Sequence, residues 1–248
     1  MSNINDTYFD GHYKDIWRAI IPAELTVKEV EFMLSYFKLE PGSKVLDLMC
    51  GYGRHTIGLA QKGIVVTAVD NLAEYIREIK ETAEKESLPV EAIQQDAISF
   101  TSSAQYDLTL CMGNSLNFFN AMDAHKLLSN IHAALKPGGY LLINSWSLTE
   151  IAVKSFVARS WNEIGDIKFL TASEYLFQPT RMEFTTTAIT KDGKTEVKRG
   201  VDYIYSVAET DAMLRQTGFR MKEIYSIPGR KKFTLGEPRA YIVAEKNS

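Results

Sequence analysis

Short apolar runs alternate with helical patterns through the first 146 residues. The apolar runs are rich in β-branched residues, and most are followed by a segment with helical periodicity. We predict strands at 44–48, 64–69, 90–95, 107–112 and 140–144. The intervening helices are expected at 54–62, 72–87 and 123–135. This alternation predicts a parallel sheet with right-handed crossovers, in which a ligand binds beyond the C-terminal ends of the strands.

Both ends of the chain depart from this pattern. Residues 8–21 form an amphipathic, aromatic segment, and Thr26 is expected to cap a helix that continues to about Leu39. A further helix is expected over 151–160. Ser206 is expected to cap a last helix that ends near 216, and two final strands at 219–227 and 239–244 should form a hairpin at the edge of the sheet.

Residues 162–205 contain many Thr, Phe, Tyr and Val residues. A turn at Asp192-Gly193 between alternating segments is typical of a hairpin, so we predict an antiparallel insertion of three or four strands. Strand alternation places four side chains of this insertion on one face: Arg199, Val201, Tyr203 and Tyr205. That face either packs on the core or turns partly toward a ligand.

The predicted fold class is therefore α/β. We expect a seven-stranded, mostly parallel doubly wound sheet with an antiparallel terminal hairpin, plus a small antiparallel β insertion. The whole chain, 1–248, is expected to form a single domain. Its expected parts are an N-terminal helical cap (1–40), a Rossmann-like core (41–146 and 206–248) and an inserted, substrate-covering subdomain (147–205).

A glycine-rich turn follows the first predicted core strand. Asp47 lies within the strand, and Gly51 and Gly53 follow one residue apart before a helical pattern. Such a turn often only makes a tight connection, but it also brings backbone against a ligand at a helix N-terminus. A dinucleotide pyrophosphate is disfavoured because Asp47 would repel it and Thr56 occupies the place of the third glycine. A ligand with a cationic amino-acid head would be attracted.

A second acid ends the next strand. Asp70 lies about 20 residues beyond the glycine turn, where a carboxylate can accept both hydroxyls of a ribose. Nicotinamide and adenosylmethionine enzymes share this arrangement, so Asp70 indicates an adenosine ligand without choosing between them. The alternative is that Asp70 only caps the helix that starts at Asn71.

Composition is ordinary for a globular enzyme, with 45% hydrophobic and 24% charged residues. A net charge of −3 gives no electrostatic basis for binding nucleic acid. We expect neither a membrane span nor a signal peptide, and no metal site. Cys50 and Cys111 do not suggest a disulfide framework, so a cytoplasmic location is expected.

The stretch Val45–Gly53 resembles motif I of the class I S-adenosylmethionine-dependent methyltransferases, usually hydrophobic-Leu-Asp-x-Gly-Cys-Gly-x-Gly. Met49 stands where the family usually has its first glycine, which bears on how closely the chain approaches the cofactor. The helix stop between 135 and 140, Asp96 and the segment 205–219 are also similar to the family. The resemblance covers about 40–146 and 205–246, and the N-terminal helices and the insertion lie outside it.

The resemblance implies S-adenosyl-L-methionine as the cofactor and a set of residues that bind it. Asp96 and the amide of Ala97 would hold the adenine, or Asp96 would only cap a turn. Arg54 would pair with the methionyl carboxylate, or it is a surface arginine. Asn114 belongs to a Gly-Asn-Ser segment similar to one in glycine N-methyltransferases, or to a helix cap. The full implied set is Tyr8, Asp47, Cys50, Gly51, Gly53, Arg54, Asp70, Asn71, Asp96, Ala97, Met112 and Asn114.

The expected activity is transfer of a methyl group to an N or O nucleophile of a small molecule by a monomer or homodimer. The aromatic N-terminal segment and the insertion are expected to roof the site. No general base is assigned, because His12, His55, His125 and His132 are each more often structural or solvated. The alternatives are a nicotinamide-dependent oxidoreductase and a non-catalytic adenosylmethionine-binding scaffold.

Overall fold

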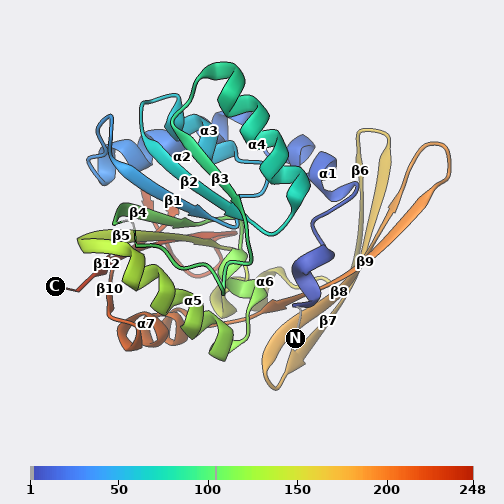
Figure 1. Cartoon of the computed structure of the whole chain (residues 1–248). Helices are drawn as coiled ribbons and strands as arrows, with labels where there is room; N and C mark the ends of the chain where they lie inside the picture. Colours follow the sequence, from blue (N-terminus) through green and yellow to red (C-terminus); the bar gives the residue numbers. More distant parts are fainter. Residues whose placement is uncertain (1–2, 104, 248) are drawn as a thin grey trace.

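The protein is built on an eight-stranded sheet of order β11-β10-β12-β5-β4-β1-β2-β3 (Figure 1). The computed structural model describes residues 3–103 and 105–247. Strands β1 to β5 are parallel, whereas β12 pairs antiparallel with β5 and β10. The strands are β1 Lys44–Leu48, β2 Val65–Asp70, β3 Val90–Gln94, β4 Tyr106–Cys111, β5 Leu135–Ser145, β10 Phe219–Ile227, β11 Lys231–Lys232 and β12 Ala240–Lys246.

The predicted α/β class is confirmed, with two differences in the sheet. The expected seven strands are eight, because the two residues of β11 pair with β10 and are too few for a period of two to be read. Strand β5 begins at Leu135 rather than at 140, since Leu135 already pairs with Tyr106 of β4. The bounds of β1 to β4 agree with the prediction to within one residue.

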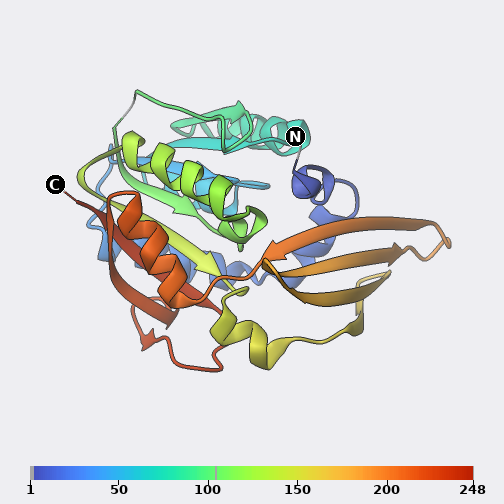
Figure 2. The same cartoon turned by 90° about the horizontal axis from the view of Figure 1, so that it is seen from below.

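Helices cover both faces of the sheet (Figures 1 and 2). On one face lie α2 Ala23–Tyr36, α3 Arg54–Ala60 and α4 Ala73–Glu86. On the other lie α5 Ala121–Ala134, α6 Thr149–Ser155 and α7 Val207–Gln216. Within the described ranges, no helix combines the length and the apolar character that crossing a membrane requires.

Alternate side chains of the central strands enter separate hydrophobic cores on the two sides of the sheet. Leu46 and Leu48 of β1 join the core that α5 and α7 cover, whereas Val45 joins the core under α2 and α3. A strand buried on both faces reads as a continuous apolar run, which explains why β1 could be recognised. Asp47 is the polar exception in this run, with an exposed fraction of 1%.

A separate four-stranded antiparallel sheet lies beyond the C-terminal ends of β1 to β5 (Figures 1 and 2). Its strands are β6 Arg159–Ile164, β7 Ile167–Phe177, β8 Thr180–Ile189 and β9 Thr195–Tyr203. The insertion predicted from the Asp192-Gly193 turn is therefore present with four strands. Helix α6 ends at Ser155, not near 160, because the chain enters β6 at Arg159.

The face of β9 predicted from alternation is buried only toward the end of the strand. Arg199 is exposed, whereas Gly200, Val201 and Asp202 are all buried, so both faces of the end of β9 are covered. The cover on the second face is the N-terminal segment, residues 3–20. Asn5 of this segment accepts from Val201 N at 3.0 Å and donates to Val201 O at 2.8 Å. It thus satisfies the backbone of an edge strand.

The N-terminal helices differ from the prediction as well. Within the expected segment 8–21, only α1, Tyr13–Ile20, is helical. A separate turn of 3-10 helix, η1, Ile4–Thr7, precedes the segment, and Gly11 before α1 has φ +64°. Thr26 does not cap α2, which begins after Pro22. A proline has no backbone N–H to satisfy, and so suits the start of a helix. Thr26 lies inside α2, where its hydroxyl accepts from Arg54 at 3.0 Å.

Glu29 joins α2 to the rest of the core through a buried polar cluster. Its Oε1 accepts from the Tyr241 hydroxyl of β12 at 2.6 Å, and its Oε2 lies 2.9 Å from His55 Nε2 and accepts from Arg54 Nη1. Burial alone would raise the pKa of Glu29, but His55, Arg54 and Tyr241 lower it to about 2. The ionised carboxylate therefore contributes to folding stability.

We predict that Glu29→Gln lowers the free energy of unfolding at pH 7 by about 3 kcal/mol, because it breaks a buried ion pair. The folded-state pKa lies below the usual value of 4.5, so this contribution is complete above pH 5 and declines as the pH falls toward 2. Urea unfolding at pH 7 and pH 3 should therefore show a smaller difference between variant and wild type at pH 3. Glu31→Gln, at an exposed position of the same helix, is the control. A difference that does not change with pH would contradict this role.

Candidate functional site

A cavity opens at the C-terminal ends of the parallel strands, where the fold predicts a ligand site. It holds about 1010 Å³ of space, including its mouth. Nine of the predicted site residues lie in its wall: Asp47, Cys50, Gly51, Arg54, Asp70, Asn71, Asp96, Ala97 and Met112. Tyr8, Gly53 and Asn114 do not lie in the wall.

The glycine turn has three residues in the left-handed region. Met49 has φ +56°, Gly51 +55° and Gly53 +78°. At Gly53 a Cβ would lie 2.6 Å from Ile79 Cγ1, so this glycine is required by packing against α4 and not by the cavity. At Gly51 a Cβ would meet no atom within 4 Å, because the backbone faces open space. Met49 keeps the left-handed conformation although it is not a glycine.

Asp70 joins this turn to the end of β2. Its Oδ2 accepts from Gly51 N at 2.9 Å, and its Oδ1 accepts from Leu72 N at 3.0 Å. The side chain is 7% exposed, and burial raises its pKa. Because each carboxylate oxygen can accept more than one hydrogen bond, Asp70 can hold the turn and still accept from a ligand.

Asp47 is more deeply enclosed than Asp70. Its Oδ2 accepts from the Thr56 hydroxyl at 2.7 Å, so Thr56 has its own role in place of the third glycine of a dinucleotide fold. Burial raises the pKa of Asp47, although His55, Thr56 and Arg54 oppose this effect. Arg54 itself is bound to Glu29 and Thr26, which fixes its guanidinium at one end of the cavity.

Asp96 is exposed and forms the turn after β3. Its Oδ1 accepts from Ile98 N at 2.9 Å and from Ser99 N at 3.1 Å, which is the turn-capping alternative. It nevertheless lies in the cavity wall beside Ala97. The two interpretations of Asp96 are therefore compatible.

Two predicted residues outside the wall act in the framework behind it. Asn114 is fully buried, donates to Asp202 and Ser147, and accepts from the backbone N–H of Trp146 and Ser147. Its amide therefore joins η2, Ser115–Phe118, to the end of β5 and to β9. Tyr8 is buried among other aromatic rings, with Phe184 of β8 at a centroid distance of 5.1 Å.

The N-terminal segment supplies wall residues that the motif comparison did not name. Phe9, Tyr13 and Trp17 lie in the wall, as the roof hypothesis expected from their aromatic character. The remaining wall residues outside the predicted set are Asn3, Asn5, Asp6, Met49, Tyr52, His55, Tyr75, Gly113, Ser115, Phe118 and Phe119. Asn3 and Asp6 form a capping box, a local pattern that could have revealed η1 in the sequence.

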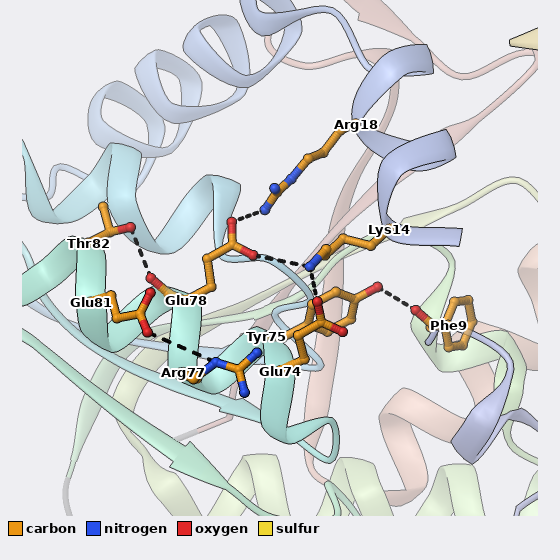
Figure 3. A network of polar contacts seen from close by, with 9 residues as sticks. All are labelled: Phe9, Lys14, Arg18, Glu74, Tyr75, Arg77, Glu78, Glu81 and Thr82. Carbon is orange, nitrogen blue, oxygen red and sulfur yellow. Dashed lines mark hydrogen bonds and ion pairs between the residues drawn. The ribbon is translucent and has the colours of Figure 1, made fainter. Parts of the chain in front are cut away.

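Polar contacts attach the N-terminal segment, which forms the roof of the cavity, to α4 on one side (Figure 3). Lys14 and Arg18 form ion pairs with Glu78, and Lys14 also pairs with Glu74. The Tyr75 hydroxyl donates to Phe9 O at 2.6 Å, and Figure 3 shows the tyrosine pointing from α4 toward the N-terminal segment.

The roof is also fastened to β9 on its other side. Lys198 donates to Thr7 O at 2.9 Å and forms an ion pair with Asp10. Glu196 accepts from His12 N at 3.3 Å. These contacts hold the N-terminal segment over the cavity, whose described wall contains no residue of the four-stranded sheet.

Comparison with known proteins agrees with this geometry. Residues 45–139 match the family model of the methyltransferase domain. A glycine/sarcosine N-methyltransferase from Halorhodospira halochloris is 29% identical over 143 residues. The match covers 56% of this chain and 53% of the relative, so the chain spans about half the length of that relative.

Two solved structures share the fold over almost the whole chain. A S-adenosylmethionine-dependent methyltransferase from Clostridium acetobutylicum ATCC 824 gives a TM-score of 0.82 at 17% identity, covering 95% of this chain and 96% of that one. S-adenosylmethionine-bound CalS10, an amino pentose methyltransferase from Micromonospora echinaspora, gives 0.72 at 17% identity, covering 96% and 98%. The domain match, the fold and the glycine turn agree: residues 45–139 match a methyltransferase domain, and almost the whole chain has the fold of S-adenosylmethionine-dependent methyltransferases.

Proposed function

We propose that this protein transfers the methyl group of S-adenosylmethionine to an N or O nucleophile of a small molecule. The observation that carries the proposal is the hydrogen bond of 2.9 Å from Gly51 N to Asp70, two residues 19 positions apart. This hydrogen bond places the backbone of a glycine beside the buried carboxylate of Asp70, and both residues lie in the wall of the cavity. An adenosine with an amino-acid head requires both features.

The residues present fit this cofactor. Asp70 is proposed to accept from the ribose hydroxyls, with Asn71 beside it, and Asp96 and the Ala97 amide to hold the adenine. The open space at Gly51 would receive the amino-acid portion, near the carboxylate of Asp47. Arg54 has five N–H donors, so it can keep Glu29 and still donate to a carboxylate.

Cys50 and Met112 complete the proposed binding wall as apolar side chains. Burial raises the pKa of the Cys50 thiol, with the charges of Asp47 and Asp70 adding to the effect. The thiol therefore stays protonated and is no nucleophile. Gly53 supports the site by packing against α4. Tyr8 packs behind the aromatic residues of the roof, and Asn114 holds the segment after β4 in place.

The cofactor supplies a methyl group already activated by a sulfonium centre. The protein has to align the acceptor in line with that methyl group and exclude water. The acceptor lone pair forms the new bond to carbon, and the electrons of the broken carbon–sulfur bond stay on sulfur. The roof of Phe9, Tyr13 and Trp17 is proposed to enclose this reaction. No side chain is assigned as a general base.

The names of related proteins support a small acceptor. The relative from Halorhodospira halochloris is a glycine/sarcosine N-methyltransferase, and CalS10 is an amino pentose methyltransferase. Both names refer to nitrogen-containing acceptors, which favours an N nucleophile. The proposal also includes a cytoplasmic location, a monomer or homodimer and no nucleic-acid partner, consistent with the net charge of −3.

We predict that S-adenosylhomocysteine raises the melting temperature and that NAD does not. A ligand at about 100 times its Kd stabilises the fold by about 2.7 kcal/mol, which corresponds to roughly 5–10 °C for a chain of this size. Differential scanning fluorimetry with each ligand measures the shift. A shift with NAD alone would revive the nicotinamide alternative. Binding of the cofactor without turnover of any acceptor would favour the scaffold.

Asp70→Ala should weaken binding of S-adenosylhomocysteine about tenfold to hundredfold, because unpaired buried polar groups cost about 1–3 kcal/mol. Isothermal titration calorimetry measures this loss. The control is Glu91→Ala, at an exposed acid near the start of β3. Wild-type affinity in a folded Asp70→Ala protein would show that Asp70 only caps the α4 turn.

A further inference from the structure

The charges around the cavity are unbalanced. Four carboxylates lie in its wall: Asp6, Asp47, Asp70 and Asp96. Arg54 is the one arginine in the described wall, which contains no lysine. It is bound to Glu29 and is proposed above to bind the carboxylate of the cofactor, so it is not available to the acceptor. An anionic acceptor would therefore meet like charges and no free cation.

Asp202 adds a fifth acid behind the wall, and the proposed cofactor does not account for it. The residue is 5% exposed on β9, and its Oδ2 accepts from Ser147 Oγ at 2.8 Å and from Asn114 Nδ2 at 3.0 Å. No ion pair involves Asp202 in the part of the chain that the structure describes. Burial raises its pKa to about 7, which reflects the cost of a buried carboxylate without a cation.

Asp202 lies directly behind the cavity wall, because its partner Asn114 stands in the chain between the wall residues Gly113 and Ser115. Burial raises the pKa of Tyr8 to about 12 and that of Tyr13 as well, and the charge of Asp202 adds to both shifts. The two rings lie edge to face at 5.0 Å, and Tyr13 stacks on Trp17 at 5.9 Å. Tyr13 and Trp17 form cavity wall, and the buried Tyr8 packs on Tyr13.

Aromatic side chains from the N-terminal segment and from η2 line the part of the cavity where the acceptor is expected to bind. Phe9 of the roof packs against Phe118 of η2 at 4.8 Å, and Phe119 also lies in the wall. Aromatic faces with a carboxylate behind them attract a cationic group and exclude an anionic one. This combination suits a nitrogen that becomes positively charged as it is methylated.

We propose that the acceptor is an amine with an apolar or aromatic body and without a carboxylate or phosphate, and that Asp202 is a positioning residue for its nitrogen. The inference rests on the proposed function and names its substrate class. The acceptor would react as the neutral amine, after its ammonium form has lost a proton to water. Its lone pair would form the nitrogen–carbon bond while the electrons of the carbon–sulfur bond stay on sulfur, and the product would leave as an ammonium ion. Glycine and sarcosine, which carry a carboxylate, are excluded as good acceptors, unlike in the relative named for them.

Matched pairs of acceptors test this proposal on the full chain. Formation of S-adenosylhomocysteine from S-adenosylmethionine is measured with tryptamine against tryptophan, phenethylamine against phenylalanine, and methylamine against glycine. We expect at least one amine to react with a kcat/KM ten times that of its carboxylate partner or more. A carboxylate partner that reacts as well, a hydroxyl acceptor that reacts better, or no reaction with any amine overturns the proposal.

Asp202→Asn separates the role of the charge from that of the fold. Asparagine is close in shape and can keep the contact with Ser147, so we expect KM for the reactive amine to rise about tenfold with kcat changed less than threefold. Asp166→Asn, at an exposed acid in the turn between β6 and β7, should change neither constant. An unchanged KM in Asp202→Asn overturns the role of Asp202. The acceptor pairs remain decisive if this variant does not fold.

The cofactor assay distinguishes the two levels of failure. If the protein binds S-adenosylhomocysteine but methylates no amine, the inference about the acceptor is refuted and the proposed function still stands. If the protein does not bind S-adenosylhomocysteine, both the proposed function and the inference about the acceptor are refuted.

Discussion

The site depends on one hydrogen bond between backbone and carboxylate. Gly51 N donates to Asp70 Oδ2, and the other oxygen of Asp70 accepts from Leu72 N at the start of α4. The end of β1, the end of β2 and the next helix are thereby held in one fixed arrangement. The geometry also requires Gly53, whose position leaves no room for a Cβ against Ile79. The two glycines of the turn thus have separate physical causes, open space at Gly51 and packing at Gly53.

The parts of this arrangement that could be predicted from sequence are local. Strands β1 to β4 are apolar runs bounded by turn residues, and Ser206 caps α7 as expected, in a capping box with Glu209. Asp47, Gly51 and Asp70 could be identified because strand ends and glycine turns are encoded by neighbouring residues. The parallel order of strands then brings them together without further information.

The parts that could not be predicted depend on contacts between distant segments. Asn5 binds the edge of β9, 196 residues away, and nothing in its own neighbourhood indicates this partner. Asn114 was expected in the cofactor site because of its motif, but Asp202 and the backbone beyond β5 use its whole amide. The face of β9 was assigned by alternation, which indicates the side chains that share a face but not which distant segment covers each face.

These distant contacts affect the chemistry, since they hold in place the N-terminal segment that lines the cavity. The central claim is that Gly51 and Asp70 present an adenosine cofactor to that enclosed space. A crystal structure with S-adenosylhomocysteine tests it most directly. The account predicts both ribose hydroxyls within hydrogen-bond distance of the Asp70 carboxylate and the amino-acid portion against Gly51. Ligand bound elsewhere, or a ribose that does not contact Asp70, would contradict it.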